Sequence, residues 1–81
     1  MDIENKVIVI TGSAQGLGKT FARDLAARKA RLALVDINIE SLEQVRVACS
    51  DKGIEVRSYE VNVAEEPSVE QLFDQVVKDF G

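Results

Sequence analysis

The chain has 81 residues, of which 46% are hydrophobic, and its 14 acidic and 10 basic residues give a net charge of −4 at pH 7. This composition predicts one small folded domain over residues 1–81 rather than a disordered segment. The basic residues are scattered, which argues against a nucleic-acid partner. The apolar run near the amino terminus covers only residues 7–10, too short for a signal peptide or a membrane span.

The first predicted element is a strand at residues 7–10, where the sequence Val-Ile-Val-Ile shows no polar alternation. An unbroken apolar run is typical of a strand that is buried on both faces. Residues 11–18 follow with the sequence Thr-Gly-Ser-Ala-Gln-Gly-Leu-Gly, and a helix is predicted over residues 17–28. A glycine-rich turn therefore joins a strand to a helix.

This turn predicts a phosphate-binding site. The first turn of a helix offers unpaired backbone N–H groups, with the positive end of the helix dipole behind them. We expect Gly12 to allow a sharp turn out of the strand, Gly16 to let a ligand approach the backbone, and Gly18 to let the helix pack close to the sheet. The alternative interpretation is an ordinary strand-to-helix turn that binds nothing.

The second predicted strand covers residues 31–36. Lys29 and Ala30 stand before it, where a glycine would suit the turn out of the helix, so we expect one of them to be strained. Asp36 closes the strand at the position where a dinucleotide ribose needs an acceptor, and its carboxylate would repel a 2′-phosphate. The neighbouring residues Ala14, Gln15 and Ile37 carry no compensating charge. The sequence therefore predicts NAD rather than NADP.

The remaining elements repeat the same alternation. A second helix is predicted over residues 39–51, with Asn38 as its N-cap and Gly53 beyond its end, and a third strand over residues 54–61. Apolar residues between 69 and 80 recur at helical spacing, and Pro67 falls in the first turn of that helix. The order βαβαβα predicts an α/β fold with a parallel sheet, half of a doubly wound Rossmann fold.

Three segments resemble the short-chain dehydrogenase/reductase family, in particular its 3-oxoacyl-reductase-like members. They are Thr-Gly-x-x-x-Gly-x-Gly at 11–18, Leu-Val-Asp at 34–36 and Val-Asn-Val at 61–63. The resemblance spans the whole chain and implies strand order 3-2-1 and an NAD-dependent oxidoreductase acting on a carbonyl or alcohol. The cofactor contacts that it implies are Gly12, Ser13, Gln15, Gly16, Leu17, Gly18, Asp36, Ile37, Asn62 and Val63.

The chain departs from the family pattern in two respects. Asn62 stands where the family usually has aspartate, and we expect its amide oxygen to accept a weaker hydrogen bond from the adenine amino group. The family's catalytic Ser and Tyr-x-x-x-Lys set is also missing, and Tyr59 cannot replace that tyrosine because Val63, four residues later, is not lysine. We therefore expect a cofactor-binding segment that does not turn over substrate by itself.

Two other functions remain open from the sequence. Gly18, Lys19 and Thr20 have the sequence that ends a P-loop, although Ser13 occupies the position where a P-loop needs its first glycine. A nucleoside-triphosphate-binding module is thus one alternative, and a non-catalytic nucleotide-binding module is another.

Cys49 is the only cysteine and the chain has no histidine, so neither a metal site nor a thiol nucleophile has partners. We expect Cys49 to be a core residue, and the single cysteine without a targeting segment indicates the cytosol. In the family's sheet a fourth strand lies beside the first. We therefore expect the first strand to expose an edge here, through which two copies of the chain associate.

Overall fold

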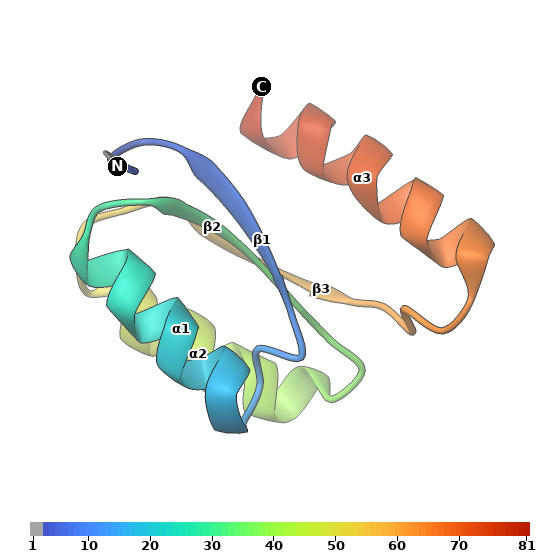
Figure 1. The fold of residues 1–81 in the computed structure, drawn as a ribbon, viewed down its shortest axis with the longest axis horizontal. Coiled ribbons are helices and arrows are strands. Elements are labelled where there is room, and N and C mark those ends of the chain that lie inside the picture. Colours follow the sequence, from blue (N-terminus) through green and yellow to red (C-terminus); the bar gives the residue numbers. More distant parts are fainter. Residues whose placement is uncertain (1–2) are drawn as a thin grey trace.

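The computed structural model of the chain describes residues 3–81. Three strands alternate with three helices in the predicted order (Figure 1). They are β1 (Val7–Thr11), α1 (Gly16–Ala27), β2 (Arg31–Asp36), α2 (Ile39–Ser50), β3 (Val56–Glu60) and α3 (Glu66–Phe80).

The strands form one parallel sheet in the order β1-β2-β3, as predicted. Val7 of β1 lies opposite Arg31 of β2, and Leu32 of β2 lies opposite Val56 of β3. Because parallel strands run in the same direction, their carboxyl ends meet at one edge of the sheet. The loops that follow Thr11 and Asp36 and the one that follows Glu60 lie along this edge (Figure 1).

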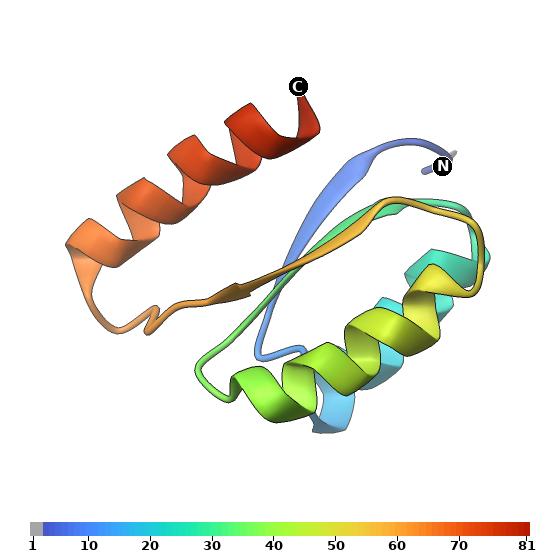
Figure 2. The ribbon, with the colours of Figure 1, turned by 180° about the vertical axis from the view of Figure 1, so that it is seen from behind.

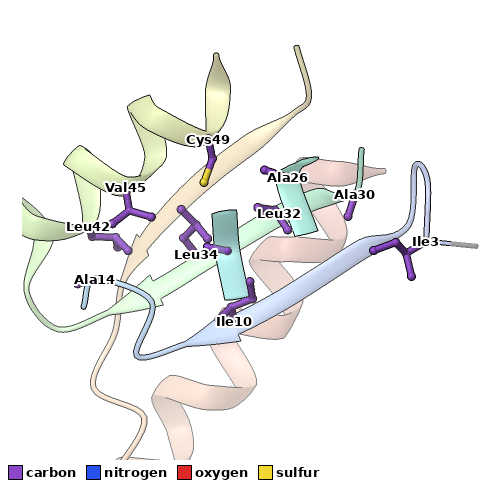
Figure 3. Close-up of a cluster of buried hydrophobic side chains, with 11 residues drawn as sticks. Ile3, Ile10, Ala14, Ala26, Ala30, Leu32, Leu34, Leu42, Val45 and Cys49 are labelled. Carbon is purple, nitrogen blue, oxygen red and sulfur yellow. The ribbon is translucent and has the colours of Figure 1, made fainter. Parts of the chain in front are cut away.

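Helices α1 and α2 cover one face of the sheet and α3 lies on the other, as Figures 1 and 2 show. Strand β2 supplies side chains to both layers. Its residues Leu32 and Leu34 belong to the cluster beneath α1 and α2, which Figure 3 shows, whereas Ala33 and Val35 belong to the cluster beneath α3. All four side chains are fully buried, so β2 is the central strand of the core.

The predicted burial of the strand at residues 7–10 is confirmed only in part. Ile8 and the buried Ile10 pack in the cluster beneath α1 and α2, and Val7 and Val9 pack against the cluster beneath α3. Val7, Ile8 and Val9 are only half-buried. Within residues 3–81, β1 has a hydrogen-bonded neighbour on one side only. An apolar run shows that a strand lacks polar side chains, but the position of the strand in the sheet decides how deeply its side chains are buried.

The predicted signals at the element ends are confirmed. The Ser41 N–H donates to Oδ1 of Asn38 at 3.2 Å, which caps α2. Lys29 has a φ of 67° and is the strained residue expected before β2. Its Nζ donates to the carbonyl oxygen of Lys52 at 2.6 Å, which ties this turn to the one after α2.

Strand β3 is shorter than the predicted 54–61, but its backbone pairing continues beyond both ends. The Leu32 N–H donates to the Glu55 carbonyl oxygen at 3.0 Å, and the Val61 N–H donates to that of Asp36 at 3.2 Å. Residue 61 is thus held beside the end of β2. Within residues 3–81, none of the helices has the length and apolar character that crossing a membrane requires.

Candidate functional site

The turn between β1 and α1 is tied to the end of β2. Ser13 is fully buried, and its N–H donates to the Val35 carbonyl oxygen at 3.2 Å. The Val35 N–H in turn donates to Oγ of Ser13 at 3.0 Å. One residue further, the Ala14 N–H donates to Oδ2 of Asp36 at 3.0 Å. These bonds within the chain hold the turn in one conformation.

The three glycines of this turn are required for different structural reasons. Gly12 and Gly16 have φ values of 65° and 60°, in the left-handed region that other residues rarely adopt. Gly18 is needed for space, because a Cβ there would lie 2.8 Å from the carbonyl carbon of Gly12 and 3.1 Å from Cα of Ser13. The close contact at Gly18 is therefore with the backbone of the turn itself, whereas packing against the sheet was predicted.

Within the described part of the chain, no side chain caps the amino end of α1. Its N-cap residue Gln15 makes no side-chain cap hydrogen bond, and its first turn carries no acidic residue. In α2, by contrast, Asn38 caps the helix and Glu40 lies in the first turn. The first N–H groups of α1 and the positive end of its dipole therefore remain available for an anion such as a phosphate.

The carboxylate of Asp36 is oriented by two backbone amides. Its Oδ1 accepts from the Asn38 N–H and its Oδ2 from the Ala14 N–H, both at 3.0 Å. Each carboxylate oxygen can accept two hydrogen bonds, so one accepting position remains on each. This arrangement can accept two hydrogen bonds from the neighbouring hydroxyls of a ribose.

A cleft of about 170 Å³ opens beside Asp36 at the carboxyl edge of the sheet. It is lined by Gly12, Val35, Asp36, Ile37, Val61, Asn62 and Val63. Among the residues that the structure describes, no basic side chain lines it, and Asp36 is the one charged residue of the lining. The apolar side chains of Ile37 and Val63 are 65% and 48% exposed, which suits them to contact a flat ligand.

The structure thus brings together five of the ten residues predicted to bind the cofactor. These five lie at or just after the ends of three different strands and line the cleft: Gly12, Asp36, Ile37, Asn62 and Val63. The residues 15–18 lie at the amino end of α1, outside the cleft lining, and Leu17 among them is 70% exposed. The predictions missed Val35 and Val61, although each directly precedes a predicted residue at a strand end. The binding roles of all ten residues stay predictions.

Other reactive groups lie outside this cleft. Cys49 is buried in the core, as predicted, and burial raises the pKa of its thiol. Tyr59 donates from Oη to Oδ2 of Asp79 at 2.8 Å, so its hydroxyl is bonded to α3. Among residues 3–81, no group of histidine, cysteine or acidic side chains could hold a metal ion.

The family model for short chain dehydrogenase matches residues 6–81. The chain belongs to this family. An uncharacterized oxidoreductase of Haemophilus influenzae is 35% identical over 80 residues, which are 99% of this chain and 28% of that protein. The sequence resemblance to short-chain dehydrogenases is therefore confirmed.

Solved structures of family members show the same fold. The crystal structure of NAD+-bound xylitol dehydrogenase matches with a TM-score of 0.94 and 37% identity, over 100% of this chain and 31% of that one. An alcohol dehydrogenase from the archaeon Thermococcus sibiricus, complexed with 5-hydroxy-NADP, matches with a TM-score of 0.90 and 35% identity, over 96% of this chain and 34% of that one. The chain therefore has the Rossmann fold of these dehydrogenases and spans about a third of their length.

Proposed function

We propose that this chain binds NAD and forms the adenosine-diphosphate part of the cofactor site of a short-chain oxidoreductase. The observation that carries this proposal is the carboxylate of Asp36, held by two backbone amides beside a cleft that no basic side chain lines. A 2′-phosphate would meet this negative charge at close range, which favours NAD over NADP. The NAD+-bound and 5-hydroxy-NADP-bound relatives support a nicotinamide dinucleotide as the ligand class.

In this proposal the ligand lies along the carboxyl edge of the sheet. The pyrophosphate contacts the amino end of α1 at residues 15–18, next to the turn shaped by Gly12 and Ser13. The ribose hydroxyls donate to Asp36, and the base lies in the cleft beside Ile37, Asn62 and Val63. Residues 1–81 form one half-domain of this cofactor site.

We further propose that the whole protein transfers hydride between the nicotinamide and a carbonyl or alcohol substrate, as other short-chain oxidoreductases do. The 81 residues contain no Tyr-x-x-x-Lys sequence, so the chain by itself does not turn over substrate. The unpaired, buried Cys49 is consistent with a reducing compartment, and we propose the cytosol.

Calorimetric titration of NAD, NADP and ATP, with and without magnesium, tests the proposal. We expect NAD to bind in the presence of a chelator, NADP to bind at least about tenfold more weakly, and Asp36→Ala to abolish NAD binding. Asp74→Ala, which removes an exposed carboxylate from α3, should leave NAD binding unchanged. Strictly magnesium-dependent ATP binding would overturn the proposal in favour of the P-loop alternative.

A further inference from the structure

Strand β3 has an open outer edge. Within residues 3–81 its only hydrogen-bonded neighbour is β2, and it lies in front of β2 in Figure 2. The Glu55 carbonyl oxygen and the Val61 N–H both bond to β2. Alternate residues of a strand direct their backbone groups to opposite sides, so residues 56, 58 and 60 direct theirs away from β2. These backbone groups are open to pairing with a further strand.

A groove of about 560 Å³ lies between this edge and α3. Residues 58–62 line it on the side of the strand. On the side of the helix it is lined by residues at helical spacing, which are Ser68, Gln71, Leu72 and Gln75. Two charged residues complete the lining, Glu60 at the end of β3 and Glu65 at the N-cap of α3. Among the described residues no basic side chain lines the groove, so its charge is negative.

The other polar side chains of β3 are engaged elsewhere. Nε of Arg57 donates to Oε2 of Glu55 at 3.0 Å, and its guanidinium lies 5.8 Å from the centre of the Phe80 ring, outside the groove lining. Oγ of Ser58 donates to Oε1 of Glu43 at 2.7 Å, so this side chain lies towards α2. Charged residues on an edge strand commonly prevent pairing. Here the charge at the groove has one sign, so it repels acidic strands and attracts basic ones.

We propose that an extended segment of a partner protein, carrying a lysine or an arginine, adds as a strand to the outer edge of β3. Its backbone bonds to residues 56, 58 and 60, and its basic side chain pairs with Glu60 or Glu65 in the groove. A second copy of this chain would bring a net charge of −4 to the same edge, which disfavours it as the occupant. This inference does not depend on the proposed cofactor function.

The test is a titration of the 15N-labelled chain with the peptide acetyl-Lys-Val-Thr-Val-Lys-amide, followed by NMR. We expect the largest shift changes, and slower hydrogen exchange, at the backbone N–H groups of residues 56, 58 and 60. The same peptide with glutamate in place of both lysines should bind at least about tenfold more weakly. A lysine peptide with methylated backbone nitrogens should not bind, because it lacks the donors that a strand needs.

Charge variants of the chain separate the groove from the overall charge. Glu60→Gln combined with Glu65→Gln should weaken binding of the lysine peptide at least about fivefold. The matched control is Glu40→Gln combined with Glu70→Gln, which removes two exposed carboxylates that lie outside the groove lining. It changes the net charge by the same amount and should leave the affinity unchanged.

Three results would overturn this inference. The first is no binding of the lysine peptide at millimolar concentration, and the second is equal binding of the lysine and glutamate peptides. The third is a set of shift changes confined to β1, which would place the added strand at the other edge of the sheet.

Discussion

Just after β1, where the backbone turns away from the sheet, Ser13 continues the hydrogen bonding to β2. Its Oγ accepts from the buried N–H of Val35, and its own N–H donates to the carbonyl oxygen of the same residue. The Ser13 hydroxyl can take the place of a backbone group of a neighbouring strand, because it accepts from the Val35 N–H and can donate to the Val35 carbonyl oxygen. The turn at residues 12–15 is thus hydrogen-bonded to β2 one residue before Asp36.

Ser13→Ala should destabilise the fold by about 1–3 kcal/mol, because it leaves the Val35 N–H buried without an acceptor. Urea unfolding followed by circular dichroism measures the change. Ser68→Ala removes a hydroxyl whose bond to Glu65 is exposed and 3.5 Å long, and it should cost less than about 0.5 kcal/mol. Equal small losses in both variants would contradict the role assigned to Ser13.

The sequence predicted the acceptor at Asp36 and the uncapped helix behind the glycines, because both follow from residue type and strand order. It did not predict that the Ala14 N–H orients Asp36, since a backbone bond depends on the path of the turn. Nor did it predict that Oδ1 of Asn62 accepts from the Ala64 N–H, because such local bonds also depend on the path of a turn.

At the scale of elements, helix α3 is tied to the sheet at its carboxyl end. Oη of Tyr59 donates to Asp79, and Nη1 of Arg31 donates to the carbonyl oxygen of Phe80 at 3.2 Å. The guanidinium groups of Arg31 and Arg57 lie 6.0 and 5.8 Å from the centre of the Phe80 ring. The periodicity of residues 69–80 predicted the helix but not these contacts, because they join residues far apart in the sequence.

The Tyr59–Asp79 bond predicts a pH dependence of stability. Hydrogen bonds from Tyr59 and Gln75 lower the pKa of Asp79 below its ordinary 3.8, which adds stability at higher pH that is lost as the pH falls through the folded-state value. Burial, together with the bond to Asp79, raises the pKa of Tyr59 above its ordinary 10.0. This adds stability that is present below pH 10.0 and is lost as the pH rises towards the folded-state value.

Tyr59→Phe should therefore make the free energy of unfolding depend less on pH in the acid range. In the alkaline range it should remove the loss of stability that deprotonation of the Tyr59 phenol causes. The measurement is the free energy of unfolding in urea across the pH range. Asp74→Asn changes an exposed carboxyl on the same helix and should leave the profile nearly unchanged. A Tyr59→Phe profile that coincides with that of the unaltered chain would show that the bond does not contribute in solution.

At the scale of the whole molecule, the sheet is asymmetric. Its central strand β2 is buried, while β1 is half-buried and has one paired neighbour within residues 3–81. Unpaired strand edges offer free backbone N–H and carbonyl groups to another strand. We therefore propose that two copies of this chain associate through β1.

Sedimentation equilibrium at high micromolar concentration should show a dimer of the 81-residue chain. Val7→Lys places a charge at the start of β1 and should weaken the association, whereas Val47→Lys, at an exposed position on α2, should not. Circular dichroism checks that both variants fold. A folded monomer of the unaltered chain at this concentration would rule out pairing through β1.

The shared carboxylate of Asp36 has a consequence for attempts to change cofactor preference. Redesign towards NADP would begin by replacing this residue with a neutral one, but Oδ2 also accepts from the Ala14 N–H. The same substitution would remove a constraint on the turn at residues 12–15, which in the proposed function contacts the pyrophosphate of either cofactor. A successful redesign therefore needs a second change near Ala14 that restores an acceptor for its amide, before any basic residue is added for the 2′-phosphate.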